Sequence, residues 1–321
     1  MLFKNDKAVS PVVATLVLVV VAIIGAAAVG ALLGAFSSDV SDEASAGETS
    51  SASSSELLVA GSTTVQPVSE LLAEAFMEDH KGVKVTVQGG GSGAGVSSAG
   101  MGIVDIGAAS RAVKDTELDK YPDLQTHQIG GSAVVVIANT AAQVADEVSK
   151  AELEDLFING TAGSTIGGNF SGNVTPYQRS EESGTEDTFK EWFSKTAEID
   201  SGVEGVTGNS GVLSAVQDDS DGIGFVDFGY ADGAVGIKTL GIYDAEIGSV
   251  MTPTSDNIKK ELAATGTNVD TYYVHALTRP LNYITNGEPN TMQQAFITFA
   301  QSPGAAEYFE AVGYFPITAF A

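Results

Sequence analysis

The stretch best suited to chemistry lies near the middle of the chain, at residues 179–185, and reads RSEESGT. Arg179 offers a planar fork of hydrogen-bond donors that fits a tetrahedral oxyanion. Residues 183–185 add two hydroxyls and an unhindered backbone, and they lead into aromatic residues at helical spacing from 189 to 193. Arginine, hydroxyls and free N–H groups would therefore meet at a helix N-terminus, which is a ready-made anion site.

One alternative for this stretch is a capping box, because Ser183-x-x-Glu186 fits that pattern too. The rarity of arginine in the rest of the chain favours the anion site instead. There are only three arginines, Arg111, Arg179 and Arg279, and two of them lie in loops rich in serine and glycine. Because the chain has so few guanidinium groups, their positions indicate where an anion would bind.

The composition of the 321-residue chain sets broad limits on function. The length allows two ordinary domains. With 41 acidic and 15 basic residues the net charge is −26, which argues against nucleic acid as a partner because phosphate backbones need a basic surface. Cysteine is absent, which excludes disulfides, thiolate metal sites and cysteine nucleophiles. The three histidines lack the spacing of metal ligands, so we expect neither a metal nor a cofactor.

The N-terminal region predicts a membrane anchor. Residues 11–36 carry no charge, and this run is longer than the roughly 20 residues that span a bilayer. Lys4 and Lys7 precede it and acidic residues follow it, so the N-terminus should stay in the cytoplasm with the rest of the chain outside. A cleaved secretory signal would have a shorter apolar region. We expect a single-pass protein of the cell membrane with an extracytoplasmic body.

Residues 7–14 resemble the processing site of archaeal type IV pilin-like proteins. By that resemblance the cut would follow Ala8, giving a leader at 1–8 and a transmembrane, pilin-like helix at 9–36. An uncleaved signal anchor remains the alternative. Residues 37–55 contain almost only serine, alanine and acidic residues, so they have little to bury and predict a flexible tether.

Three further turns rich in glycine and hydroxyls each follow a predicted strand, at residues 61–64, 88–95 and 107–111. The second is not a nucleotide P-loop, because the Gly-Lys-Ser/Thr ending is missing. Each turn alone could be a flexible loop or a cap. In open α/β folds, however, ligands sit outside the carboxyl ends of the strands, where such turns gather. The three turns and residues 179–185 are therefore predicted to surround one anion.

At this point the body, over about residues 57–318, resembles the phosphate-binding proteins that serve ABC-type phosphate importers. The motifs that carry the resemblance are GSTTVQP at 61–67, GSGAG at 91–95, DIGAASR at 105–111, RSEESGT at 179–185, TRPLNY at 278–283 and VGYFPI at 312–317. The resemblance implies an α/β, two-lobed periplasmic-binding-protein-like fold of type II, with two crossing strands as the hinge. Lobe one would comprise 56–138 and 273–321, and lobe two 139–272. The apolar strand at 131–139 and residues 272–277 would be the crossings.

The resemblance also implies a ligand set. The predicted phosphate ligands are Thr63, Thr64, Ser92, Ser110, Arg111, Arg179, Ser183, Gly184 and Thr185, with Glu181 bracing Arg179. The first four would come from one lobe and residues 179–185 from the other, so binding would close the hinge.

One position departs from the family. Better-studied members have an aspartate after the serine of the third turn, where this chain has Arg111. An ionised carboxylate only accepts hydrogen bonds, so it favours a protonated phosphate over proton-free sulfate. Its loss leaves discrimination against sulfate unexplained. Arg111 either contacts the ligand, which we favour, or pairs with Asp105 or another acid.

The sequence thus predicts an extracytoplasmic binding protein, not an enzyme, with a monomeric body that captures inorganic phosphate and delivers it to the permease of an ABC importer. A pilin-like filament subunit and a general receptor for oxyanions such as sulfate or molybdate are the alternatives. A phosphate-ester hydrolase is disfavoured, because no metal-ligand cluster or paired nucleophile and base is present. Three sequons, at Asn159, Asn169 and Asn173, leave glycosylation open.

Overall fold

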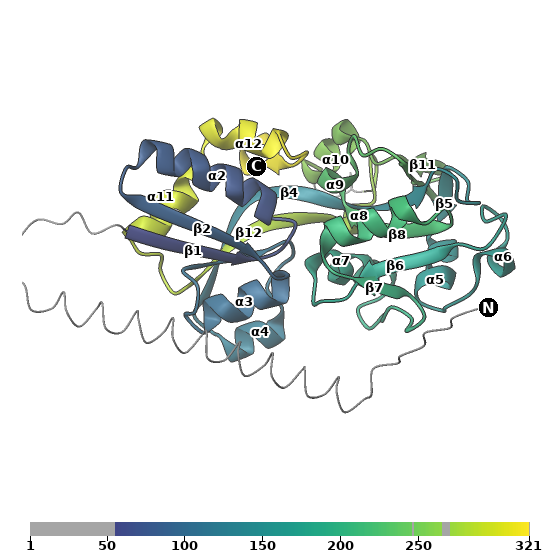
Figure 1. Cartoon of the computed structure of the whole chain (residues 1–321), viewed down its shortest axis with the longest axis horizontal. Coiled ribbons are helices and arrows are strands. Elements are labelled where there is room, and N and C mark those ends of the chain that lie inside the picture. Colours follow the sequence, from purple (N-terminus) through teal and green to yellow (C-terminus); the bar gives the residue numbers. More distant parts are fainter. Residues whose placement is uncertain (1–54, 246, 265–269, 321) are drawn as a thin grey trace, which may run out of the picture. The chain divides into compact units, whose positions relative to one another are not determined.

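The computed structural model describes residues 55–245, 247–264 and 270–320 (Figure 1). The described residues belong to one compact unit. The predicted leader, the predicted apolar helix and all but the last residue of the predicted tether lie outside the described residues. Within the described part of the chain, no helix is both long and apolar enough to cross a bilayer.

A long mixed sheet runs through the unit in the order β2-β1-β3-β12-β4-β8-β6-β7, and β9 and β13 also pair with β4. β1 and β6 are each parallel to both of their neighbours, whereas β4 is antiparallel to β12 and β8. The strands of this sheet are β1 (Ser55–Gly61), β2 (Val83–Gly89), β3 (Ile106–Ala109), β4 (Leu124–Asn139), β6 (Thr175–Arg179), β7 (Glu204–Val206), β8 (Gly222–Asp227), β9 (Ile237–Thr239), β12 (Thr278–Asn286) and β13 (Phe315–Pro316). A small second sheet joins β5 (Glu147–Ser149), β10 (Gly241–Asp244) and β11 (Ser249–Met251).

The strand β4 belongs to both halves of the molecule. Residues 124–133 pair with β12, and residues 134–138 pair with β8. Every residue from 129 to 139 is buried, as expected of a strand covered on both faces. We call the part built on β1, β2, β3, β12 and the first half of β4 lobe one, and the part built on β6, β7, β8 and the second half of β4 lobe two. The predicted strand at 131–139 is confirmed and is longer than predicted. The lobe boundary at residue 138 stays a prediction, because the change of partner falls within β4 itself.

Helices connect the strands and cover the sheet. In lobe one, α2, α11 and α12 lie on one face and α3 and α4 on the other (Figure 1). Residues 68–76, where apolar side chains recur at helical spacing, lie within α2. The helices are α2 (Gln66–Asp79), α3 (Ser92–Gly100), α4 (Asp115–Lys120), α5 (Lys150–Phe157), α6 (Gly163–Ile166), α7 (Gly184–Phe193), α8 (Gly208–Asp218), α9 (Phe228–Ala231), α10 (Ser255–Leu262), α11 (Thr291–Ala300) and α12 (Ala306–Glu310).

The prediction that residues 272–277 form a second crossing strand is wrong. The chain instead makes a 3₁₀ turn at His275–Leu277 before β12 begins. The physical reason is the fully buried Glu261 of α10. Its carboxylate accepts the backbone N–H groups of residues 270–273 at 2.9–3.4 Å, and these are the donors that a strand would need for pairing.

Each lobe has its own hydrophobic core. The core of lobe one packs α2 and α11 on the sheet, with the rings of Phe76 and Phe296 edge to face at 5.2 Å. In lobe two, the ring of Phe189 stacks on Phe225 at 4.1 Å and meets Phe157 edge to face at 5.2 Å. Phe189 was predicted on the apolar face of a helix, and it fixes α7, and hence the preceding turn, to the lobe-two sheet.

We predict that Phe189→Ala destabilises the body by about 3–5 kcal/mol, because it leaves a cavity in a packed aromatic cluster. Thermal denaturation followed by circular dichroism would measure this as a lower melting temperature. Val235→Ala is the matched control, because that side chain is 81% exposed. Equal melting temperatures for the two variants would contradict the packing described here.

Candidate anion-binding site

Four turns that follow parallel strands meet at the junction of the two lobes. Three come from lobe one, after β1, β2 and β3, and one comes from lobe two, between β6 and α7. The strands of each lobe are parallel here, so their carboxyl ends lie at one edge of the sheet. The structure therefore brings together the turns that the sequence singled out.

Three serine hydroxyls form the lobe-one side of the junction. Ser62 Oγ donates to Ser110 Oγ at 3.0 Å, and the backbone N–H of Ser110 donates to Ser92 Oγ at 3.1 Å. None of the three is more than 2% exposed. Ser62 was not among the predicted ligands, and it has a local role as well, because its hydroxyl oxygen accepts the backbone N–H groups of residues 64 and 65.

The first residue of α7 lies directly against these hydroxyls. A Cβ atom added to Gly184 would be 2.6 Å from Oγ of Ser92 and 2.6 Å from Oγ of Ser110. A side chain there would force the two serine side chains or the start of α7 to shift. Glycine at this position thus allows the N-terminus of a lobe-two helix to approach the lobe-one hydroxyls.

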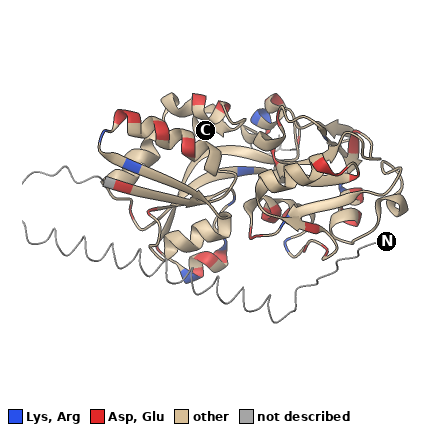
Figure 2. Ribbon diagram, viewed as in Figure 1, with Lys and Arg blue, Asp and Glu red and all other residues tan. Residues whose placement is uncertain are grey.

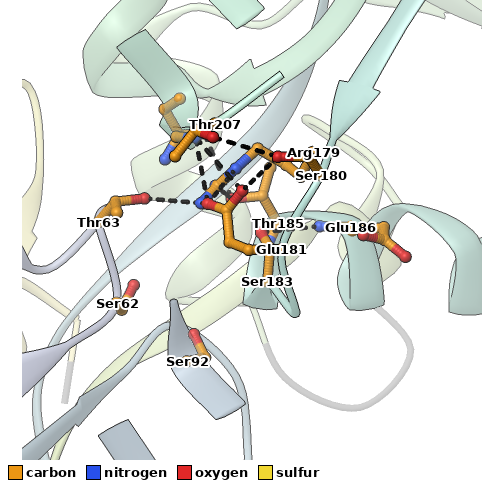
Figure 3. Close-up of polar contacts among 12 residues, drawn as sticks. Ser62, Thr63, Ser92, Arg179, Ser180, Glu181, Ser183, Thr185, Glu186 and Thr207 are labelled. Atoms are coloured by element: carbon orange, nitrogen blue, oxygen red, sulfur yellow. Dashed lines mark hydrogen bonds and ion pairs between the residues drawn. The ribbon is translucent and has the colours of Figure 1, made fainter. Parts of the chain in front are cut away.

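Arg179 joins the two lobes through threonine hydroxyls (Figure 3). Its Nη2 donates to Thr63 Oγ1 of lobe one at 2.9 Å, and its Nη1 approaches Thr185 Oγ1 of α7 at 3.5 Å. The hydroxyls of Thr64 and Thr185 are 3.4 Å apart. Charge and hydroxyl donors from both lobes therefore converge within a few ångströms of each other.

Glu181 holds the guanidinium of Arg179 in place. Nε of Arg179 donates to Glu181 Oε1 at 3.0 Å, Nη2 contacts the same oxygen, and the N–H of Gly208 donates to it at 3.1 Å. Burial lowers the pKa of Arg179, and the partner Glu181 opposes that effect. Burial would raise the pKa of Glu181, but the hydrogen bond and charge of Arg179 outweigh burial and lower it. Both groups are charged at neutral pH.

Ser183 caps α7, but the capping box that its motif allowed is not formed. Its Oγ caps α7 by accepting the N–H groups of Thr185 at 3.1 Å and Glu186 at 3.4 Å. The carboxylate of Glu186 pairs with Lys190. A hydroxyl that accepts two N–H groups still has its own proton to donate. Ser183 can therefore cap the helix and bind an anion at the same time.

Arg111 pairs with acidic residues, which is the alternative that the sequence left open beside ligand contact. Its Nη1 and Nη2 each donate to an oxygen of Glu117 at 2.8 Å. Its Nε lies 2.8 Å from Oδ2 of Asp187, in an ion pair that is not aligned as a hydrogen bond. Asp105 is not the partner, because its carboxylate accepts the N–H of Leu58. All three nitrogens are thus engaged, and since Asp187 lies on α7, the pair ties lobe one to lobe two.

Three buried residues that sequence reasoning missed also reach the junction. Asn209 Nδ2 and Arg279 Nη2 donate to Thr64 Oγ1 at 2.9 and 3.0 Å, and Arg279 Nη2 also donates to Asp227 Oδ2 at 2.6 Å. The available signal was the scarcity of arginine. All three arginines are buried at the junction, whereas acidic residues are spread over the ribbon of both lobes (Figure 2).

Among the residues that the structure describes, no group of three or more histidine, aspartate and glutamate side chains is placed to hold a metal ion. What the junction offers is an array of donors: two guanidinium groups and several hydroxyls, gathered at the N-terminus of α7. Such an array suits a small oxyanion.

Two α/β lobes that share a strand and hold a donor array at their junction are typical of proteins that bind a small ligand between two lobes. A family model described as a PBP superfamily domain matches residues 46–303, and the chain therefore belongs to that superfamily.

Named relatives are similar over most of the chain. The phosphate-binding protein PstS of Bacillus subtilis is 27% identical over 268 residues, which cover 83% of this chain and 82% of the relative. PstS of Staphylococcus aureus (strain USA300) is 28% identical over 250 residues, or 74% of this chain and 72% of the relative. The crystal structure of an ABC-type phosphate transport receptor from Vibrio cholerae has a TM-score of 0.62 at 25% identity and covers 81% of this chain and 99% of that chain.

We predict that Glu181→Gln lowers the melting temperature at neutral pH and that the difference from wild type shrinks in acid. The folded-state pKa of Glu181 lies below its ordinary value, so its stabilisation is present above the unfolded-state pKa and is lost as pH falls through the folded-state pKa. Melting curves from neutral pH down to below the ordinary glutamate range would measure this. Glu191→Gln, an exposed change in α7, is the control and should show no such convergence.

Proposed function

We propose that this protein is the extracytoplasmic phosphate-binding component of an ABC importer. The observation that carries the proposal is Arg179, a buried guanidinium braced by Glu181 and in contact with hydroxyls of both lobes. Membership of the PBP superfamily and similarity to phosphate-binding proteins support it. The protein would act by binding alone, as a monomeric body without a cofactor, and would not be an enzyme.

In this proposal the anion occupies the junction and accepts hydrogen bonds from both lobes. Arg179 contributes charge, the N–H of Gly184 at the start of α7 contributes a backbone donor, and the hydroxyls complete a tetrahedral shell. The proposed ligands are Thr63, Thr64, Ser92, Ser110, Arg179, Ser183, Gly184 and Thr185, with Glu181 as the brace. Arg111 is left out, because its nitrogens are engaged by Glu117, Asp187 and the carbonyl of Ala112.

Binding would favour the closed arrangement of the lobes. The anion interacts with donors on both sides of the junction, so it stabilises the state in which they are close together. Contacts such as the Arg111–Asp187 ion pair would add to closure. The permease of the importer would then recognise the closed form.

The proposed anchor and leader rest on the sequence alone. Residues 9–36 would hold the protein in the membrane as a single pass, with 37–55 as a tether and the body outside. The pilin-like motif at 7–14 is the observation that favours a second candidate function, that of a filament subunit. Absence of the protein from purified surface filaments would remove that candidate, and its recovery there in stoichiometric amounts would favour it.

We predict that Arg179→Ala weakens phosphate binding by about 100-fold or more, because hydrogen bonds to a charged group in a buried site are lost. Calorimetric titration of the full-length protein, kept in mild detergent and stripped of endogenous ligand, would measure the change. Lys84→Ala is the control, since it removes the same charge from an exposed pair with Glu56. An Arg179→Ala variant with near-wild-type affinity would refute the ligand assignment.

We also predict that Gly184→Ala weakens phosphate binding by about 5- to 100-fold, because the new Cβ would overpack the junction. Fold stability should be kept, since alanine is a better helix residue than glycine. Gly211→Ala in α8 is the matched control, because a Cβ there would have no contact closer than 3.7 Å. Equal phosphate affinities of the two variants would show that the lobes do not close as described.

A further inference from the structure

Arg279 is held at the junction by one of its three guanidinium nitrogens. It lies on β12 opposite Ser132 of β4, and its side chain is buried. Nη2 donates to Asp227 Oδ2 at 2.6 Å and to Thr64 Oγ1 at 3.0 Å. Thr64 is a proposed ligand and is 3.4 Å from the hydroxyl of Thr185, another one. One end of the Arg279 guanidinium therefore lies within the candidate site.

The other two nitrogens, Nε and Nη1, are buried and have no hydrogen-bond partner among the described residues. Buried donors in proteins are almost always paired, and an unpaired donor on a charged group is destabilising. Asp227 cannot satisfy them by turning, because its Oδ1 already accepts Ser132 Oγ at 2.9 Å and the N–H of Gly229 at 3.1 Å. A purely structural role accounts for Nη2 and leaves Nε and Nη1 unexplained.

Arg279 also adds a second positive charge to the site. After burial itself, the charge of Arg279 is a further cause that lowers the pKa of Arg179, so the two guanidinium groups repel each other. They donate to hydroxyls that touch, Arg279 to Thr64 and Arg179 to Thr185. An anion beside both groups would relieve this repulsion and satisfy the unpaired donors of Arg279.

We propose that Arg279 is a second guanidinium ligand of the bound oxyanion and that Asp227 positions it. The inference rests on the proposed function, because it takes the same anion in the same site. The carboxylates of Glu181 and Asp227 are each engaged by an arginine and a backbone N–H group. The two arginines thus recognise the negative charge of the oxyanion and not a proton on it.

The first test compares phosphate affinity by calorimetry in full-length variants. Arg279→Met alone would leave Asp227 as an unpaired buried charge, so the key variant is Arg279→Met/Asp227→Asn, which removes both charges together. It should show a thermal unfolding transition, as a folded protein does. It should bind phosphate about 10- to 100-fold more weakly than wild type. Arg279→Lys, which keeps the charge and loses the planar fork, should show a smaller loss.

The control is Tyr283→Phe, a change to another buried side chain of β12. It removes a hydroxyl that bonds Ser69 at 2.8 Å in the core of lobe one, so phosphate affinity should not change. Unchanged affinity in the folded double variant would overturn the proposal and leave the proposed function intact. If the double variant does not fold, unchanged affinity in Arg279→Lys would have the same meaning. No phosphate binding by wild type would overturn both.

The second test uses the small number of arginines. Protein labelled with ¹⁵N only at arginine has three Nε–H groups, and the signal of Arg279 is identified by its absence in Arg279→Lys. Adding inorganic phosphate should shift this signal and slow the exchange of its proton with water, because Nε or the adjoining Nη1 acquires an acceptor. A phosphate titration that moves the Arg179 signal and not that of Arg279 would contradict the proposal.

Discussion

A guanidinium group can be buried only where carboxylates and hydrogen-bond acceptors surround it, and this requirement organises the junction. Arg179 meets it with Glu181 from its own turn and with the Thr63 hydroxyl from the opposite lobe. The acceptors on the lobe-one side are hydroxyls, which can also donate. The same geometry that accommodates the arginine therefore presents donors to an anion.

The fold supplies this geometry through a shared strand and small residues. β4 pairs with lobe one over its first half and with lobe two over its second, so the two sets of turns face each other across one continuous strand. Gly184 lets the start of α7 approach the serine hydroxyls. The Arg111–Asp187 pair then adds an ion pair between the lobes. Closure and ligand binding would thus use the same surfaces.

Much of the site could be predicted from the sequence, because its parts are local. Residues 179–185 form one turn whose brace lies two residues from its arginine. Pairing of Arg111 with an acid was left open, and its partner Glu117 is only six residues away. Its second partner, Asp187, could not be predicted, because it comes close only when the lobes meet. The place of Arg279 likewise depends on tertiary pairing. Residues 272–277 have the composition of a strand, yet the buried carboxylate of Glu261 takes their backbone donors, so local propensity was overruled.

The central claim is that the junction binds phosphate. The most direct measurement is calorimetric titration of the stripped full-length protein with inorganic phosphate, with sulfate in parallel. The account predicts tight binding of one phosphate per chain. A sulfate response equal to that of phosphate would keep the site and make it a general oxyanion receptor. No heat with either anion would contradict the account, and the buried arginines would then serve only to hold the two lobes together.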